Sequence, residues 1–361
     1  MSIIKNVIHK LEKISKKAIF GSIEAYRIYY RKMDWRNFAL KNTKDSVLTE
    51  EQNEKVKAFF LPYTKVKTIF HEFYTEKNGK FCVDYIPDDI YYCYIDPYFN
   101  DWEEAKYIDN KCLYVYLFPN IKQPEEIAVR MNGMWFNSLR QLITDEQLQD
   151  MLRNEKELFI KQATESDGGQ GVFYYRFGED FDEIIKKIKG DIIIQKKIKQ
   201  HPYLSNLNDS SVNTIRVISL LSQQGVKIYS CILRMGLNGS KVDNASSGGI
   251  TCGITKEGKL KEVAYSKGGE RFLRHPDSRI EFLNYQIPGF SEILNYVPTL
   301  HCKIPHFRLV SWDFAVDENE NPVLIEANLH YGELDFHQLN NGPIFGQDTC
   351  KILEEVYRNR K

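Results

Sequence analysis

The stretch "SWDFAVDENENPVLIEANLH", residues 311–330, decides the fold. Two apolar runs flank a cluster of turn-forming residues, and this pattern is typical of a β-hairpin. Asp313 and Glu326 lie at equal distances from the centre of the turn. A hairpin that closes symmetrically therefore places these two side chains opposite one another, with Cβ atoms about 4.5–5.5 Å apart.

The second strand of this hairpin carries polar residues where a buried strand should present hydrocarbon. Side chains alternate between the faces of a strand, so Glu326 and Asn328 point together, and strict alternation puts them on the side of Leu324. Two facing carboxylates in an apolar sheet must be protonated or neutralised by a cation. Hard oxygen ligands suit Mg²⁺ or Mn²⁺, whereas zinc prefers nitrogen and sulfur. We therefore predict a metal site formed by Asp313, Glu326 and Asn328.

Composition limits the class of protein. A chain of 361 residues with 42% hydrophobic residues can form two to three domains or subdomains. Basic and acidic residues both number 49, so no overall field favours nucleic acid as a partner. The seven cysteines are odd in number and form no CxxC pair, which indicates a reducing, cytoplasmic location. We find no apolar run long enough for a membrane span and no signal peptide pattern.

The first part of the chain is predicted to be helical. Residues 1–20 have the pattern of a basic amphipathic helix, which either packs on the protein or contacts a membrane surface peripherally. Further along, Thr49 and Gln52 form the pattern of a capping box before another amphipathic run. From about residue 60 to 135, strand-like pieces at 80–86 and 112–118 alternate with turn clusters, which predicts a small mixed α/β unit.

A glycine-rich loop follows a lysine-bearing strand. The stretch "ELFIKQATESDGGQGVFYYRF" reads as two strands joined by residues 166–171, with Lys161 on the first strand. The loop is either an ordinary hairpin or a lid whose backbone amides cover phosphates, because successive glycines allow an anion-binding arrangement. A Walker loop is excluded, since there is no GK[ST] sequence and a strand follows.

Two arginines interrupt long apolar strands further on. Ile192 to Ile194 form a short buried strand whose end, at residues 195–198, could present backbone groups to a flat heteroaromatic ring. Arg216 and Arg234 then occur within apolar runs, and a buried arginine must be paired with a structural carboxylate or an anionic ligand. Together with Lys161 and the "NASSGG" segment, they favour phosphate. The alternative is that either arginine bridges the carboxylate pair of the hairpin.

The order of these features resembles the ATP-grasp superfamily. Within it, the stretches "QKKIKQHP", "SSVNTIRVISL", "VDNASSGGI", "SWDFAVDENENPVLIEANLHYG" and "NNGPIFG" are similar to the sugar-transfer-associated ATP-grasp proteins. The resemblance covers residues 157–361 and implies an α/β fold of the α+β kind, with two subdomains that grip the nucleotide. The implied organisation is an N-terminal helical region (1–58), a mixed α/β subdomain (59–137), a lid subdomain (138–200) and a C-terminal subdomain with the metal site (201–361).

The resemblance also implies roles for individual residues. Arg216 and Arg234 would meet phosphates or the acyl phosphate, and Asp313, Glu326 and Asn328 would hold magnesium. Lys196 stands where this family has a glutamate, which puts a side-chain contact to adenine, and the preference for ATP, in doubt. The implied ATP-binding residues are Lys161, Ser166, Gly168, Gly169, Gly171, Gln195, Lys196, Lys197, Ile198 and Asn244.

The reaction that the resemblance implies is an ATP-dependent carboxylate–amine ligation. A substrate carboxylate would attack the γ-phosphate, and an amine would capture the acyl phosphate. No protein nucleophile is needed, because the protein must mainly align two anions and neutralise their charge. Expected partners are small molecules, such as a sugar acid or an amino acid in surface polysaccharide synthesis. The alternatives are a kinase that phosphorylates a hydroxyl group and a nucleotide-binding protein without turnover.

Overall fold

The computed structural model describes residues 23–44, 47–164, 171–243 and 248–358. The chain forms two compact units, one of Met1–Tyr98 with Phe345–Lys361 and one of Phe99–Ile344. The basic helix predicted for residues 1–20 lies outside the described residues, and the domain boundaries drawn from the sequence stay predictions. Within the described ranges, no helix has the length and apolar character needed to cross a membrane.

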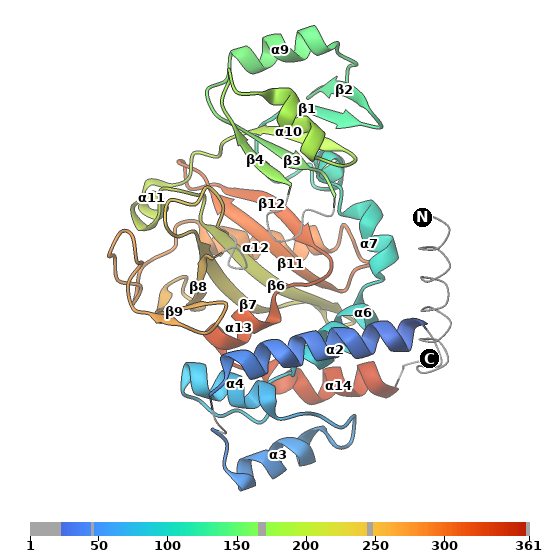
Figure 1. Ribbon diagram of the computed structural model, residues 1–361, viewed down its shortest axis with the longest axis vertical. Helices are drawn as coiled ribbons and strands as arrows, with labels where there is room; N and C mark the ends of the chain where they lie inside the picture. Colours follow the sequence, from blue (N-terminus) through green and yellow to red (C-terminus); the bar gives the residue numbers. More distant parts are fainter. Residues whose placement is uncertain (1–22, 45–46, 165–170, 244–247, 359–361) are drawn as a thin grey trace, which may run out of the picture. The chain divides into compact units, whose positions relative to one another are not determined.

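The first unit is helical in its described part (Figure 1). Its second helix begins with the predicted capping box: the Thr49 side chain accepts from the Gln52 backbone N–H, and the Gln52 side chain accepts from that of Thr49. This satisfies two amides that a helix start leaves without partners. The elements are α2 (Ile23–Asn42), α3 (Glu50–Phe60), α4 (Ile69–Asn78), α5 (Asp88–Ile90), a π-helical turn (Tyr91–Ile95), α6 (Asp96–Phe99) and α14 (Thr349–Arg358).

Both strands predicted between residues 60 and 135 are wrong. Residues 80–86 form no strand; instead the ring of Tyr85 stacks on Tyr74 of α4, with centroids 4.9 Å apart, so this aromatic segment packs against a helix. Residues 112–118 are mostly helical, and Asn110, expected to form part of a turn, caps the helical segment by accepting from the Cys112 backbone N–H. That segment comprises a 3₁₀ turn (Lys111–Leu113) and α8 (Tyr114–Leu117), after α7 (Trp102–Ile108).

The second unit is a mixed α+β structure, as predicted, and its described strands form two antiparallel sheets. The smaller sheet has the order β2-β1-β5-β3-β4. Helices α9 and α10 pack on one of its faces, against Leu158, Ile160 and Ile194. Side-chain alternation puts Lys161 and Gln195 on the other face. The elements are β1 (Glu126–Met131), β2 (Met134–Asn137), α9 (Asp145–Arg153), β3 (Leu158–Gln162), β4 (Val172–Tyr175), α10 (Phe181–Lys187) and β5 (Ile192–Lys196).

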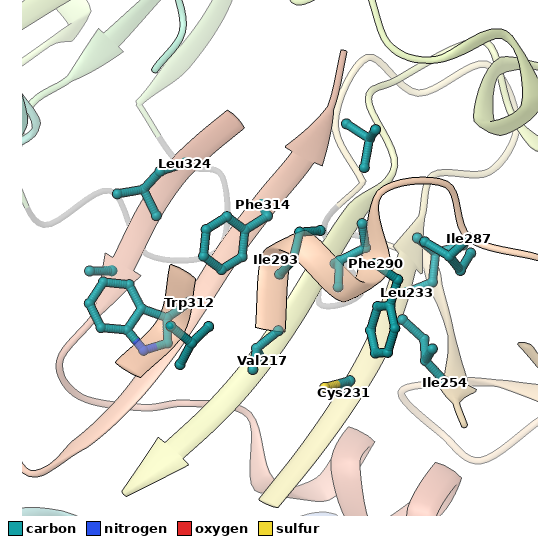
Figure 2. Packing of buried hydrophobic residues seen from close by; sticks show 14 of the residues in the cluster. Val217, Cys231, Leu233, Ile254, Ile287, Phe290, Ile293, Trp312, Phe314 and Leu324 are labelled. Carbon is teal, nitrogen blue, oxygen red and sulfur yellow. The ribbon is translucent and has the colours of Figure 1, made fainter. Parts of the chain in front are cut away.

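The larger sheet has seven described strands in the order β10-β9-β8-β7-β6-β11-β12. Helix α12 covers one face, where Ile293 packs with Trp312, Phe314 and Leu324 in the main core (Figure 2). The elements are α11 (Pro202–Leu207), β6 (Thr214–Ser222), β7 (Gly225–Met235), β8 (Ile250–Ile254), β9 (Leu260–Ser266), β10 (Arg271–Phe272), α12 (Phe290–His301), β11 (Leu309–Val316) and β12 (Pro322–Asn328).

The opposite face of the larger sheet is polar and lies against α13 (Leu334–Asn341), which contacts β7, β8 and β9. Phe336 of this helix packs on Ile232 of β7. Because side chains alternate, Ser230 and Arg234 share the face of Ile232. Arg216 pairs with Ile232 across the β6–β7 ladder and therefore lies on this face too. The fold thus gathers the charged side chains on the face away from the main core.

The β11–β12 hairpin confirms the predicted pairing and corrects the predicted face. Asp313 pairs with Glu326, as the symmetric closure required, but the next pair is Phe314 with Leu324. Ile325 is therefore an extra residue, a β-bulge that shifts the alternation by one position. Leu324 joins Phe314 in the core (Figure 2), whereas Glu326 lies with Asp313 on the other face. The sheet accordingly buries no carboxylate among its core hydrocarbon.

Candidate active site

Asp313 lies at the centre of the polar face. Its Oδ1 accepts from Arg216 Nε (2.7 Å), and its Oδ2 accepts from Arg216 Nη2 (2.6 Å) and Arg234 Nη1 (3.1 Å). The side chain of Asp313 is only 5% exposed. Burial alone would raise the pKa of this carboxyl, but the charges of Arg216 and then Arg234 hold it below its usual value. Asp313 is therefore a carboxylate at neutral pH.

Arg216 binds a further carboxylate, and Arg234 lies near two, none of which the sequence nominated. Arg216 Nη1 donates to Glu333, and Arg234 Nε lies 4.0 Å from Glu333 and 3.9 Å from Asp243. Glu333 has a left-handed backbone, with φ of 58°, immediately before α13. A non-glycine residue in this conformation carries strain that the surrounding structure must hold. The strain here coincides with an ion pair to a buried arginine.

Glu326 has a partner of its own. Lys111 Nζ lies 2.6 Å from Glu326 Oε1, and the Lys111 side chain is 7% exposed. On the same strand, Asn328 Nδ2 donates to the carbonyl of Ser311 (3.1 Å) and to Asp313 Oδ2 (3.4 Å). The alternative drawn from the sequence was that Arg216 or Arg234 bridges the Asp313–Glu326 pair. Both arginines bind Asp313, but the described structure records no bond from either to Glu326. Glu326 is instead neutralised by a lysine from another segment.

The oxygens of the predicted metal site suit a hard divalent cation in type. Asp313 pairs with Glu326, and Asn328 pairs with Ser311, so all three side chains lie on one face. Across the described ranges, no three His, Cys, Asp or Glu side chains gather closely enough to bind a metal by themselves. Mg²⁺ commonly takes one or two carboxylates and completes its shell with water and substrate phosphates. The metal assignment stays a prediction, and Arg216 and Lys111 would have to share these oxygens with the ion.

Lys161 extends the positive charge of the site across to the smaller sheet. Its Nζ donates to Gln195 Oε1 (3.0 Å). Burial, and then the positive charge of Lys111, lower the pKa of Lys161 to about 8, although Glu326 and Asp243 act in the opposite direction. A buried lysine whose positive charge is disfavoured by a neighbouring lysine forms a place where an anion would be stabilised. This is the environment expected of a lysine that contacts phosphate.

Two of the other predicted nucleotide-binding lysines have structural partners. Lys196 Nζ lies 2.7 Å from Glu125 and 2.9 Å from Glu155, and alternation along β5 points it away from the face of Lys161. Lys197 Nζ lies 3.1 Å from Glu157. Ile198 follows β5, and Gly171, at φ of 79°, precedes β4. The remaining predicted residues, Ser166, Gly168, Gly169 and Asn244, lie outside the described residues.

Sequence reasoning missed Lys111, Asp243 and Glu333. Lys111 lay in a segment predicted as a strand, and its partner Glu326 is 215 residues away. Asp243 immediately precedes the "NASSGG" segment, which the sequence had linked to phosphate. An acidic residue at this place was a usable signal for a partner of the buried arginines. Glu333 follows the hairpin by a few residues but carries no local pattern. Only the three-dimensional structure brings it to Arg216.

Comparison with known proteins gives a family match and distant similarities to solved structures. No curated protein sequence matches the chain. The D-alanine-D-alanine ligase from Coxiella burnetii is 12% identical, covers 70% of this chain and 58% of its own, and has a TM-score of 0.40. The N5-carboxyaminoimidazole synthetase from Staphylococcus aureus, complexed with ADP, is 11% identical, with coverages of 66% and 52% and a TM-score of 0.39.

A third solved structure, the L-amino acid ligase from Bacillus licheniformis, is 12% identical, covers 69% of this chain and 48% of its own, and has a TM-score of 0.38. The chain therefore spans about half the length of these three structures. A family model described as sugar-transfer associated ATP-grasp matches residues 184–352. This segment runs from α10 to α14 and includes Arg216, Arg234, Asp313 and Glu326. The resemblance read from the sequence is confirmed: residues 184–352 match the model of the sugar-transfer associated ATP-grasp family.

Proposed function

We propose that the protein is an ATP-dependent carboxylate–amine ligase that works through an acyl phosphate. One observation carries the proposal. On the polar face, four buried or half-buried cations, Lys111, Lys161, Arg216 and Arg234, surround the paired carboxylates of Asp313 and Glu326. A site of this kind can neutralise both a triphosphate and a substrate carboxylate, which is the main task of catalysis when two anions react.

In the proposed reaction, the chain's own residues align the anions. Lys161 would hold the α- and β-phosphates. Its lowered pKa indicates that neighbouring carboxylates do not fully offset the effects of burial and of Lys111 on its charge. Arg216 and Arg234 would neutralise the charge that develops between the γ-phosphate and the attacking carboxylate. Asp313, Glu326 and Asn328 would hold Mg²⁺ or Mn²⁺, which supplies charge neutralisation at the transferred phosphoryl group. The loop at 166–171 is proposed to cover the triphosphate.

The substrates that we propose are small: a sugar acid or an amino acid as the carboxylate, and an amine. The family's association with sugar transfer supports a role in surface polysaccharide or sugar-conjugate synthesis. We also propose a cytoplasmic location without nucleic acid as a partner, because all seven cysteines are free and the net charge is zero. Peripheral membrane contact through residues 1–20 belongs to the same proposal.

The decisive experiment is a screen of acids and amines, in pairs and singly, for release of ADP and phosphate with Mg²⁺. A ligase releases both products only when acid and amine are present together. Stable accumulation of a phosphorylated hydroxyl compound, without free phosphate, would instead show a kinase. If ATP binds but no pair of substrates releases ADP, the protein is a nucleotide-binding protein without turnover.

A further inference from the structure

Unbonded polar atoms gather under α13, beside the arginines. Of the eleven buried side-chain nitrogen and oxygen atoms without a hydrogen-bond partner in the described structure, four lie in this region: Arg234 Nε, His337 Nε2, Asn340 Oδ1 and Asn341 Oδ1. The side-chain amide of Asn340 donates a hydrogen bond to Thr251 Oγ1. Thr251 in turn pairs with Arg234 across the β7–β8 ladder. Buried polar atoms are rarely left without partners, so such a group indicates a place where a ligand supplies them.

His337 is the least expected member of this group. It is fully buried, and its Nδ1 lies 2.7 Å from Ser230 Oγ on β7. Burial, and then the charges of Arg216 and Arg234, lower the pKa of His337 well below its usual value, so the ring is neutral. Ser230 and Arg234 share one face of β7, so the ring lies on the face that carries the arginines. One of its nitrogens is bonded, and the other is not.

The hydrogen-bond network determines which nitrogen of His337 carries the proton. Asn341 Nδ2 donates to Ser230 Oγ (2.8 Å) and to the Cys231 carbonyl (2.9 Å), which fixes the orientation of the amide. The Ser230 hydroxyl therefore accepts one bond and has its own hydrogen to donate. Of the two described side-chain groups bonded to Ser230 Oγ, Asn341 Nδ2 is a donor, so we infer that His337 Nδ1 accepts this hydrogen. A neutral imidazole that accepts at Nδ1 carries its proton on Nε2.

A second histidine of the same unit provides an internal comparison. Trp312 Nε1 donates to Ser219 Oγ (2.9 Å), and Ser219 Oγ lies 2.8 Å from His301 Nδ1. The Nε2 of His301 lies 2.9 Å from the carbonyl of Phe307, so this nitrogen must be the donor. His301 is thus a core histidine with both nitrogens satisfied. His337 has the same serine arrangement, but its Nε2–H has no acceptor in the described protein.

We propose that His337 is a substrate-binding residue, whose Nε2–H donates a hydrogen bond, beside Arg234 Nε–H, to the oxyanion of the acid substrate and then of its acyl phosphate. Ser230 and Asn341 are positioning residues that hold the ring in the required tautomer. A neutral donor suits this position, because a third cation beside Arg216 and Arg234 would repel them. The proposal deepens the ligase proposal and rests on it for the identity of the anion.

A spectroscopic test addresses His337 without turnover. In protein with ¹⁵N-labelled histidine, NMR of the His337 ring is expected to show a proton on Nε2 at neutral pH. With ADP and Mg²⁺ present, acetate or inorganic phosphate should shift this signal, and the His301 signal should stay unchanged. An unprotonated Nε2, or no shift with either anion, would overturn the proposal. A full shift with ATP and Mg²⁺ alone, and none on adding acetate, would assign His337 to the nucleotide.

A pair of substitutions separates substrate binding from a structural role. His337→Asn keeps a polar atom at the position of Nδ1, beside Ser230, whereas His337→Gln keeps a donor near the position of Nε2. We expect His337→Asn to raise the KM for the acid at least about tenfold, with the KM for ATP unchanged, since a lost hydrogen bond to a charged group costs about 1.5–3 kcal/mol. His337→Gln should recover most of this loss. The reverse order of the two variants would show that His337 only supports the fold.

The outcome for His337 can be told apart from the outcome for the ligase proposal. His301→Gln is the matched control, because both nitrogens of His301 serve the protein; it should lower stability without changing the KM for the acid. If no acid and amine pair releases ADP, the ligase proposal fails. The NMR titration with acetate and phosphate still decides whether His337 Nε2–H binds an oxyanion.

Discussion

At the scale of single residues, Lys161 is a buried lysine with no carboxylate partner among the described ion pairs. In the described structure, Lys161 Nζ donates to the neutral amide oxygen of Gln195. The nearby positive charge of Lys111 disfavours the charged form of Lys161. A structural lysine is normally paired with a carboxylate, as Lys111 is with Glu326. Lys161 instead has a neutral acceptor in the described structure, and phosphate oxygens would supply the negatively charged acceptors that its ammonium group lacks.

Replacing Lys161 by Met should weaken ATP binding and leave the fold intact. A lost charge-assisted hydrogen bond costs about 1.5–3 kcal/mol, which is a loss of affinity of roughly 10- to 150-fold. Thermal unfolding of the empty protein should change little, since no ion pair is broken. Unchanged ATP affinity in calorimetry, together with a large loss of stability, would show a structural lysine.

The lowered pKa of Lys161 makes ATP affinity dependent on pH. The empty protein releases the proton of Lys161 as the pH rises through about 8, whereas bound phosphate favours the charged amine. ATP binding should therefore weaken above pH 8, and calorimetry near that pH in buffers of different ionisation enthalpy should detect proton uptake on binding. Lys161→Met should show neither effect.

Glu326 is expected to be essential for turnover, but its ion pair with Lys111 complicates the test. Glu326→Ala would leave a lysine with a 7% exposed side chain without a carboxylate, and breaking such a buried pair costs about 3–5 kcal/mol. The double variant Lys111→Met, Glu326→Gln removes both charges and should restore much of the stability. We expect turnover to fall at least about 100-fold in both variants. Activity near that of the wild type in either one would exclude Glu326 from the metal site.

At the scale of elements, the bulge in β12 decides which side chains face the site. Ile325 is the extra residue, so Leu324 packs in the core while Glu326 faces Asp313. With Ile325 present but no bulge, strict alternation would turn Glu326 to the face of Leu324. If Ile325 were deleted, Glu326 would follow Leu324 directly and stay on the polar face, but without the bend and twist of the bulge.

Deleting Ile325 should therefore be tolerated by the core and damage the site. We expect a change in the free energy of unfolding of less than about 2 kcal/mol, with loss of activity, because the bulge aims the carboxylate. Deleting Ala327 is the control: it moves Asn328 onto the core face, where an unbonded amide costs about 1–3 kcal/mol in addition to the lost packing. Denaturant unfolding of the two deletions would check this order of stability. Equal damage from both deletions would show that the bulge is needed for the sheet itself.

At the scale of the whole molecule, each unit contains a buried histidine that makes its stability depend on pH. Burial lowers the pKa of His71 in the first unit and of His301 in the second to about 4. Both folded values lie below the unfolded value of about 6.5, so the neutral ring is favoured in the folded state. The resulting stability is fully present above pH 6.5 and is lost as the pH falls through about 4.

We expect both units to lose stability between pH 6.5 and 4, by at most about 3 kcal/mol for each histidine. Variants that keep only Trp35, which stacks on Tyr92 in the first unit, or only Trp312, in the core of the second, would let fluorescence follow each unit separately. His71→Gln should reduce the pH dependence of the first unit alone, and His301→Gln that of the second. A pH profile unchanged by either substitution would assign the acid sensitivity to other groups.

The sequence by itself determined the features that depend on local patterns. The centre of the hairpin fixed the pairing of Asp313 with Glu326, and the Thr49 capping box predicted the start of α3. Apolar runs predicted β5, β6 and β7, and the burial of Arg216 predicted that it would have charged partners. These predictions succeeded because turn closure, capping and strand alternation involve residues that are neighbours in the chain.

Only the tertiary structure decided the partners of these residues and the conformation of aromatic segments. Lys111 meets Glu326, and Glu333 meets Arg216, across sequence separations of 215 and 117 residues, which local periodicity cannot indicate. The segments at 80–86 and 112–118 have strand-like composition, but Tyr85 packs against helix α4, and Phe118, at the end of a helical segment, packs on Trp312 of β11. The bulge at Ile325 likewise leaves no mark in the sequence, because its extra residue is apolar like its neighbours.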